Sequence, residues 1–187
     1  TQWERLYIDP FSGPGRRTDD EEPETLFLVP KEKNATSPSI AIKYGAGFDR
    51  FIFNDISPEF IQSLEKEIDT KKRTNFFSLE ANQFILELVH QTDWRKTRAV
   101  LFLDPFGLEV NWNTLEAVSR TGAIDVVMLF PTSSLCRMLP NADLPPLSWQ
   151  EKLNRFLGTD EWQKFYHKQE FQDLLERQER LSRIANS

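Results

Sequence analysis

The sequence is poor in cysteine and histidine, the side chains that build disulfides and many metal centres. Its 187 residues include one cysteine, Cys136, and two histidines. A single cysteine excludes a disulfide or a thiolate metal cluster formed within the chain, and two histidines are too few for the usual histidine-based metal site. We therefore predict no bound metal, and we expect Cys136, which follows Leu135, to be a small buried side chain.

Long hydrophobic runs are missing as well. No segment approaches the roughly 18 consecutive apolar residues that a membrane-spanning helix requires, and no signal peptide is visible. The sequence therefore predicts a protein that does not cross a membrane and that resides in the cytoplasm. Because the chain starts at Thr1 and its first apolar run begins at Leu6, we expect the native N-terminus to lie further upstream.

Basic residues are fewer than acidic residues in this chain. The chain has 23 Lys and Arg against 29 Asp and Glu, a net charge of −6, which argues against a large nucleic-acid footprint. Five of the acids lie within residues 19–24, and such a run is usually a solvated loop. The rest of the chain is close to neutral, so the composition still allows a local basic groove.

What the sequence does contain is an aromatic-rich apolar fraction arranged in short runs. Fifteen Phe and five Trp provide material for a substantial core. The runs alternate with segments of helical periodicity, which predicts an α/β fold with a mostly parallel sheet and helices on both faces. The expected strands are residues 5–9, 51–53, 76–77, 98–103 and 124–130. The expected helices begin near Ser37 and Ser57, the N-caps, and include residues 84–88 and 112–120.

Two regions depart from this alternation. Residues 18–36 are polar and acidic, and we expect an insertion there with a short edge strand at 26–29. Residues 136–187 are expected to form a helical extension that packs on, or continues, a domain formed by residues 1–135. The extension should end in an amphipathic helix. Three tryptophans lie at helical spacing from apolar neighbours and are expected in the core: Trp112, Trp149 and Trp162.

Polar residues follow the predicted strands at the points where the strands end: Asp9, Asp55, Glu80, Asn82 and Asp104. Right-handed crossovers bring the carboxyl ends of parallel strands to one edge of a sheet. Ligands bind along this edge in such folds. The sequence therefore predicts a small-molecule site built from these side chains.

The first of these strand ends is a glycine turn, Asp9-Pro-Phe-Ser-Gly-Pro-Gly15. A dinucleotide fingerprint requires a third glycine where this chain has Thr18, so a nicotinamide cofactor is disfavoured. No Gly-Lys-Ser/Thr follows, which disfavours a P-loop. A plain βα turn remains the alternative. After the second strand, Asp55 is placed to accept hydrogen bonds from a ribose diol, and the alternative is that Asn54 or Asp55 caps the next helix.

The fourth strand ends in Asp104-Pro105-Phe106-Gly107. Together with the glycine turn and Asp55, this motif resembles S-adenosylmethionine-dependent methyltransferases that modify exocyclic amines of nucleic-acid bases through an Asp/Asn-Pro-Pro-Tyr/Phe motif. More specifically, the chain is similar to the three-Cys-motif partner family. The stretches that carry this resemblance are residues 7–15, 37–42, 51–58, 102–107, 125–131 and 156–162, with Arg137.

The resemblance implies a Rossmann-like methyltransferase fold that binds S-adenosylmethionine. Four residues would line the methionine end of the cofactor: Asp9, Phe11, Gly13 and Gly15. Four further residues would surround its adenosine, with Asp55 at the ribose hydroxyls, Ile56 against the adenine, and Glu80 and Asn82 at the adenine edge.

The resemblance also implies how a target base would be held. Asp104 and the Pro105 carbonyl would accept hydrogen bonds from its amine, and Phe106 would stack on the base. The chain is one proline short of the Asp-Pro-Pro-Tyr pattern, so a core position for Phe106 is the alternative.

Two functions follow from this reading of the sequence. The first is methyl transfer to an exocyclic amine of a DNA or RNA base. The second is a catalytically inactive methyltransferase-like module that binds a partner protein, the three-cysteine, radical-SAM-like neighbour after which the family is named. A Mg²⁺-dependent nuclease is a weaker third option, because the acids are spread over several strand ends.

Overall fold

The computed structural model describes residues 3–15, 36–68, 73–139 and 144–167. The expected strand at 26–29 and the final amphipathic helix lie outside these residues. Within the described ranges, no helix has both the length and the apolar character needed to cross a membrane.

The centre of the molecule is one parallel sheet, as the sequence predicts. Its strands lie in the order β3-β2-β1-β4-β5, so β1 is the middle strand, and every neighbouring pair is parallel. The strands are β1 (Glu4–Asp9), β2 (Arg50–Asn54), β3 (Thr74–Phe77), β4 (Thr97–Leu103) and β5 (Ile124–Met128). The chain crosses from one half of the sheet to the other between β3 and β4, and this reversal next to the middle strand is where open α/β sheets bind ligands.

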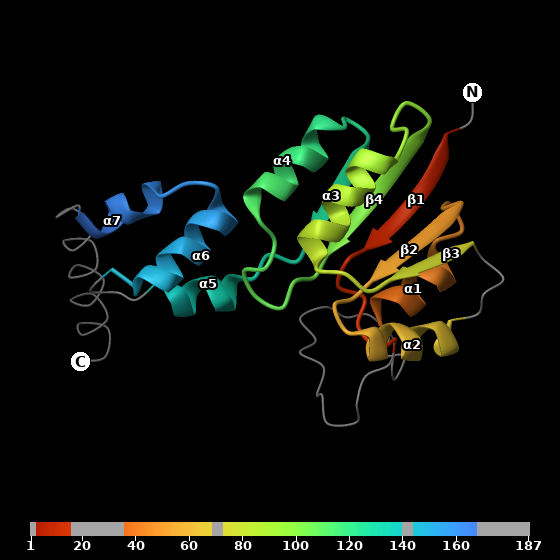
Figure 1. Ribbon diagram of the computed structural model, residues 1–187, viewed down its shortest axis with the longest axis horizontal. Helices are drawn as coiled ribbons and strands as arrows, with labels where there is room; N and C mark the ends of the chain where they lie inside the picture. The colour runs from red at the N-terminus through yellow and green to blue at the C-terminus, as the bar shows by residue number, and fades with distance from the viewer. Residues whose placement is uncertain (1–2, 16–35, 69–72, 140–143, 168–187) are drawn as a thin grey trace, which may run out of the picture.

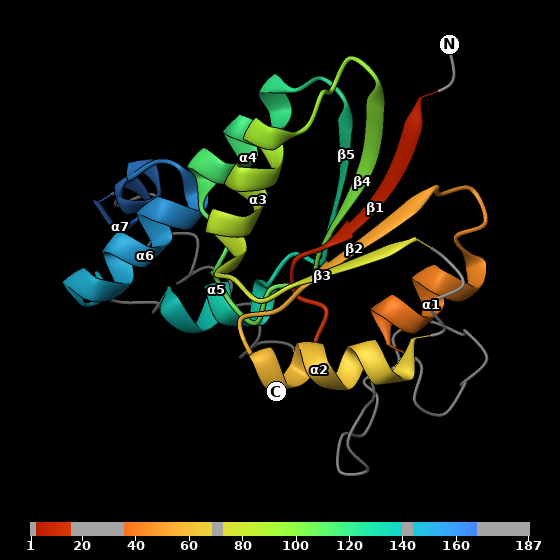
Figure 2. The ribbon, with the colours of Figure 1, turned by 45° about the vertical axis from the view of Figure 1, so that its right-hand side comes forward.

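Helices cover both faces of the sheet (Figure 2). One face is covered by α1 (Ser37–Tyr44) and α2 (Pro58–Glu67), and the other by α3 (Ala81–Gln91) and α4 (Trp112–Arg120). Each face has its own apolar core, because alternate side chains of the strands point to opposite sides. The prediction of a Rossmann-like α/β fold with helices on both faces is confirmed.

Local sequence explains where α1 and α2 begin. Ser57 caps α2 as expected, since its hydroxyl accepts a hydrogen bond from the Phe60 N–H at 3.2 Å. The predicted cap of α1 was wrong by one residue: Thr36 is the N-cap and Ser37 is the first helical residue. The reason is that the Ser37 hydroxyl donates instead to Asp9 Oδ2, at 2.7 Å.

The C-terminal part of the described chain is helical and lies beside α4 and α3 (Figure 1). It consists of α5 (Thr132–Met138), α6 (Leu147–Leu157), a short 3-10 helix η1 (Glu161–Gln163) and α7 (Lys164–His167). A third apolar cluster joins it to the sheet domain, because Leu108, in the loop after β4, packs with Leu153 and Phe156 of α6. The side chain of Trp162 is buried in this cluster, which confirms one of the three expected core tryptophans.

Three predicted burials were wrong. Trp112 and Trp149 are 43% and 40% exposed, because each lies in the first turn of its helix with only part of its ring covered. Cys136 is exposed, since α5 has no buried residue. The fifth strand also ends earlier than predicted, at Met128, and Leu129 and Phe130 after it are about half exposed.

Candidate functional site

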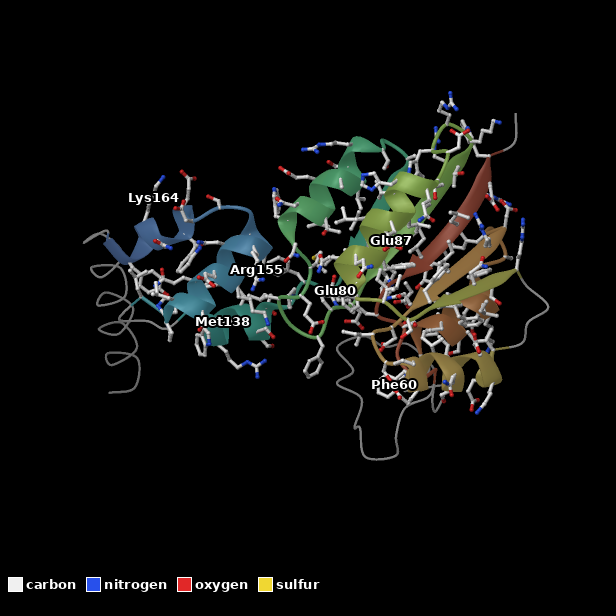
Figure 3. All side chains as sticks on the ribbon, viewed as in Figure 1. Phe60, Glu80, Glu87, Met138, Arg155 and Lys164 are labelled. Atoms are coloured by element: carbon white, nitrogen blue, oxygen red, sulfur yellow. The ribbon has the colours of Figure 1, made fainter. Side chains whose placement is uncertain are left out.

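A pocket of about 710 Å³ lies at the carboxyl edge of the sheet. Its walls come from the residues that follow β1, β2, β3 and β4, and from α6. Figure 3 labels one residue from each of three walls, Phe60 in α2, Glu80 before α3 and Arg155 in α6. The volume lies in the range of about 300–1,000 Å³ that is usual for small-molecule sites.

The structure brings most of the predicted site residues together. Seven of them line the pocket: Phe11, Asp55, Ile56, Glu80, Asn82, Asp104 and Phe106. The other four do not line this pocket: Asp9 is the last residue of β1, Gly13 and Gly15 follow β1, and Pro105 follows β4.

Asp55 is held in place by the backbone around it. Its Oδ2 accepts a hydrogen bond from the Gly13 N–H at 3.0 Å, and its Oδ1 accepts one from the Ser57 N–H at 2.9 Å. The alternative that Asn54 or Asp55 caps α2 does not hold, since Ser57 is the cap. Each Asp55 oxygen keeps capacity for a further hydrogen bond to a ligand in the pocket.

Asn54, the last residue of β2, supports the position of Asp55 through its own hydrogen bonds. Its buried amide donates to the Pro10 and Leu79 carbonyls and accepts from the Leu79 N–H, at 3.0–3.1 Å. One side chain thus ties the turn after β1 and the loop after β3 to the end of β2. Sequence patterns gave no signal for this role beyond its place at a strand end.

Asp9 is fully buried behind the pocket. Its carboxylate accepts hydrogen bonds from the Ser37 hydroxyl and from the Phe11 N–H, at 2.7 and 3.1 Å. Burial raises the pKa of Asp9 to about 7, against the effect of these two hydrogen bonds, and the charges of Asp104 and Asp55 raise it further. The carboxyl therefore positions the turn after β1 and the start of α1.

The glycine turn needs at least one of its glycines for packing. A Cβ on Gly15 would lie 2.6 Å from Leu64 Cδ1, and the residue has φ of +77°. Gly15 therefore lets the turn lie directly on α2. Around Gly13 the space is open, and its N–H is the group that orients Asp55.

Glu80 and Asn82 stabilise the start of α3. Glu80 is the N-cap and accepts from the Gln83 N–H at 2.9 Å. Burial acts to raise the pKa of Glu80, but hydrogen bonds from Gln83 and Asn82 outweigh it, so the pKa is lowered. The Asn82 amide donates to Glu80 and to the Glu109 carbonyl, and it accepts from the Asn111 N–H and the Thr114 hydroxyl. All four of its hydrogen bonds are made within the protein, so a contact with a ligand would have to replace one of them.

The Asp104–Gly107 segment projects an aromatic ring into solvent. Pro105 is buried, and its carbonyl accepts from the Gly107 N–H at 2.8 Å, which closes a three-residue turn centred on Phe106. Phe106 is 95% exposed, so the alternative of a core position is wrong. Asp104 is also exposed, yet desolvation by the surrounding protein raises its pKa.

Eight further lining residues were not predicted, and four of them have a large or charged side chain: Phe60, Glu109, Lys152 and Arg155. Phe60 lies in the first turn of α2 and is 45% exposed. Burial raises the pKa of Glu109, while the positive charge of Lys152 acts in the opposite direction. Lys152 and Arg155 come from α6, more than forty residues after β4, and no local pattern connects them to the strand ends.

The pocket is therefore mixed in charge. Four carboxyls line it, those of Asp55, Glu80, Asp104 and Glu109, and the cations among its lining residues are Lys152 and Arg155. Across the described ranges, no group of three or more Asp, Glu, His or Cys side chains is placed to hold a metal ion.

Comparison with known proteins gives information about the fold of this chain. No family model and no curated protein matches the sequence. The structure is similar to the crystal structure of protein LPL1258 from Legionella pneumophila str. Philadelphia 1, which carries the family label DUF519, with a TM-score of 0.58 and 14% sequence identity. The match covers 84% of this chain and 66% of that protein. At this level of identity the likeness extends to the fold alone, and membership of the three-Cys-motif partner family stays a prediction.

Proposed function

We propose that this chain is an S-adenosylmethionine-dependent methyltransferase acting on an exocyclic amine of a DNA or RNA base. The observation that carries the proposal is that one pocket joins Asp55, after β2, to Asp104 and Phe106, after β4. These strands lie on either side of β1, so the two halves of the pocket are separated by a single strand.

The residues present fit the cofactor. Asp55 has a fixed carboxylate with capacity for two ribose hydroxyls, and Ile56 and Phe60 beside it expose apolar surface suited to adenine. The turn that contains Asp9, Phe11, Gly13 and Gly15 would line the methionine end. Glu80 would contact the adenine edge, with Asn82 holding Glu80 in place.

The target amine would be held at Asp104. When bound, S-adenosylmethionine would supply a methyl group on a cationic sulfur, whose C–S bond would break as the amine nitrogen formed its bond to that carbon. Asp104 accepts an N–H hydrogen bond, which localises the lone pair on the nitrogen. Because desolvation raises the pKa of Asp104, its carboxylate is a better acceptor for the proton that the nitrogen then loses.

The neighbours of Asp104 complete the contact with the base. The Pro105 carbonyl, which already accepts from the Gly107 N–H, has a second lone pair for the amine. Phe106 offers an exposed ring on which a flipped-out base can stack. Positioning of this kind supplies most of the rate acceleration when two reactants are held in line.

Calorimetry with S-adenosylmethionine tests the cofactor half of the proposal. The full chain should bind the cofactor, and Asp55→Ala should weaken binding at least tenfold, because two charge-assisted hydrogen bonds are lost. Asp160→Ala, which removes an exposed carboxyl outside the pocket, is the matched control. Absence of binding by the wild-type chain would remove the basis for a methyltransferase.

Transfer of labelled methyl groups to short DNA and RNA strands tests the reaction. Asp104→Ala should reduce transfer by about a hundredfold or more while cofactor affinity stays unchanged. A variant that retains full transfer would show that Asp104 does not hold the amine.

A second proposal is a methyltransferase-like module that binds a partner protein, the three-cysteine, radical-SAM-like neighbour. It is favoured by the exposed apolar side chains on and after the edge strand β5, Val126, Val127, Leu129 and Phe130, which are 43–52% exposed. Pull-down of that neighbour by the wild-type chain, lost in Val127→Lys, would favour this function. Cofactor binding with no transfer to any nucleic acid would favour it further.

A further inference from the structure

Helix α6 places two basic side chains at the pocket, and neither has an assigned role. Lys152 and Arg155 are three residues apart, so they lie on the same face of the helix and both line the pocket. In Figure 3, Arg155 lies on the side of α6 that faces Glu80 and the sheet domain. The pocket thus has a basic wall opposite its acidic strand ends.

The orientation of α6 is fixed by packing. Leu153 is fully buried and Phe156 is 5% exposed, and both contact Leu108 in the loop after β4. Phe156 also lies against Phe130, with ring centroids 5.5 Å apart. Because the buried side chains alternate with the basic ones along the helix, this packing holds Lys152 and Arg155 toward the pocket.

Lys152 and Arg155 differ in whether a nearby carboxyl balances their positive charge. Lys152 is half-buried, and its charge partly offsets the rise that burial causes in the pKa of Glu109. Arg155 is exposed, and among the described residues it makes no hydrogen bond or ion pair. A guanidinium with all of its donors free is suited to bind an oxyanion through two parallel hydrogen bonds.

The same pocket contains the exposed ring of Phe106 and the carboxyl of Asp104. An aromatic face, an acceptor for an amine and a guanidinium with no ion-pair partner in the described part of the chain are the three groups needed to bind a base together with an adjoining phosphate. A free nucleoside would use the first two groups alone. The carboxyls at the strand ends, by contrast, would repel a polyanion that approached the pocket from their side.

We propose that Arg155, assisted by Lys152, binds a backbone phosphate next to the target base, so that the substrate of this site is a nucleic-acid strand rather than a free nucleoside. The inference extends the proposed function and rests on it for the role of Asp104 and Phe106. The phosphate contact itself does not depend on methyl transfer or on the cofactor.

The experiment measures binding of a fluorescently labelled single strand of mixed sequence, as DNA and as RNA, over a series of salt concentrations. Arg155→Gln should weaken affinity about tenfold and reduce the slope of log affinity against log salt by about one. Arg155→Lys should retain the slope and lose part of the affinity, because the charge remains but the forked donor does not.

Arg120→Gln is the matched control. Arg120 lies at the C-terminal end of α4, away from the carboxyl edge, and pairs with Glu116 at 3.6 Å. Replacing Arg120 should change neither the affinity for the labelled strand nor the slope of log affinity against log salt, apart from a small effect of the altered net charge. A thermal unfolding curve for each variant checks that α6 remains packed.

The outcomes separate this inference from the proposed function. If the wild-type chain binds no S-adenosylmethionine but binds the strand in an Arg155-dependent way, the cofactor claim fails and the phosphate site stands. If Arg155→Gln behaves like Arg120→Gln, or if no strand binds, the phosphate site is overturned. If Arg155→Gln instead loses affinity for S-adenosylmethionine alone, the guanidinium binds the carboxylate of the cofactor and the inference is also overturned.

Discussion

Asp9 brings an ionisable carboxyl into the core because it ends β1, the middle strand of the sheet. Its pKa is raised to about 7, chiefly by burial. An acid whose pKa is higher in the folded protein than in the unfolded chain stabilises the fold most at low pH. The contribution of Asp9 is thus fully present below about pH 4 and is lost as the pH rises toward 7.

Asp9→Asn should remove this pH dependence. The amide has the shape of the carboxyl: its oxygen can accept from the Phe11 N–H, and its nitrogen can donate to the Ser37 hydroxyl, which reverses that bond, but it has no charge to bury. Between pH 4 and 7 the free energy of unfolding of the wild type should fall, relative to the variant, by on the order of 4 kcal/mol. Urea unfolding at several pH values measures this difference.

The exposed Asp160 provides the control for Asp9. Asp160→Asn should give a curve of stability against pH parallel to that of the wild type. If the Asp9→Asn curve is parallel as well, Asp9 is ionised in the folded protein and the raised pKa is wrong.

Asn82 lines the pocket, but all of its hydrogen bonds are made within the protein, so its role is structural. Asn82→Ala leaves the Asn111 N–H and the Thr114 hydroxyl without their acceptor, and Thr114 is buried. We expect a loss of about 2–4 kcal/mol in the free energy of unfolding. Asn75→Ala, an exposed asparagine in β3, should cost less than about 0.5 kcal/mol in the same urea experiment. A small loss for Asn82→Ala would favour a direct role at the ligand over this network.

At the scale of whole elements, the placement of α6 depends on where it ends. Gly158 follows α6 with φ of +72°, and a Cβ there would lie 2.2 Å from Cγ of Trp112, the first residue of α4. The close approach of Gly158 to this ring therefore fixes the end of α6 against the start of α4. Any shift of α6 would also move Lys152 and Arg155.

Gly158→Ala and Gly122→Ala separate backbone strain from packing. Both glycines have positive φ, but the space around Gly122 is open. Gly122→Ala should cost about 1 kcal/mol, the strain of the left-handed conformation. Gly158→Ala should cost at least 2 kcal/mol more because of the clash with Trp112. Equal losses in denaturant unfolding would mean that α6 is not fixed by this contact.

The strands and helices could be predicted because each is set by neighbours in sequence. β4 alternates buried and half-buried side chains along one apolar run, and Ser57-Pro58 marks the start of α2. Burial of single residues was harder to predict. Phe106 and Cys136 are apolar, yet both are exposed, because a turn and a helix with no buried residue hold them away from the cores.

The acidic residues at the strand ends could also be predicted from the sequence as parts of one site, whereas the basic residues of the pocket could not. Parallel strands bring their carboxyl ends to one edge, so Asp55 and Asp104 were expected near each other. Lys152 and Arg155 reach the same pocket only because Leu153 and Phe156 pack on Leu108, and such a contact between distant segments has no signature in a single sequence.

For the molecule as a whole, a ligand in this pocket would connect the two halves of the sheet, because its walls come from strands on both sides of β1. S-adenosylmethionine at about a hundred times its dissociation constant should stabilise the fold by about 2.7 kcal/mol. For a chain of this size, that corresponds to a rise of about 5–10 °C in Tm. Thermal unfolding with and without the cofactor measures it, and Asp55→Ala should show a smaller rise at the same concentration. A Tm that does not change would argue against binding at this edge.

One pair of hydrogen bonds near the pocket bears on how this protein can be altered. The Thr36 hydroxyl donates to the Gly15 carbonyl at 3.1 Å, and the Ser37 hydroxyl donates to Asp9, so Gly15 and Thr36 are held next to each other. The cost of closing a loop between fixed ends grows slowly with its length, by about 0.6 kcal/mol for each doubling. A fluorescent reporter or an affinity tag inserted between Gly15 and Thr36 would therefore have two attachment points that are already joined, and its added length should cost little stability.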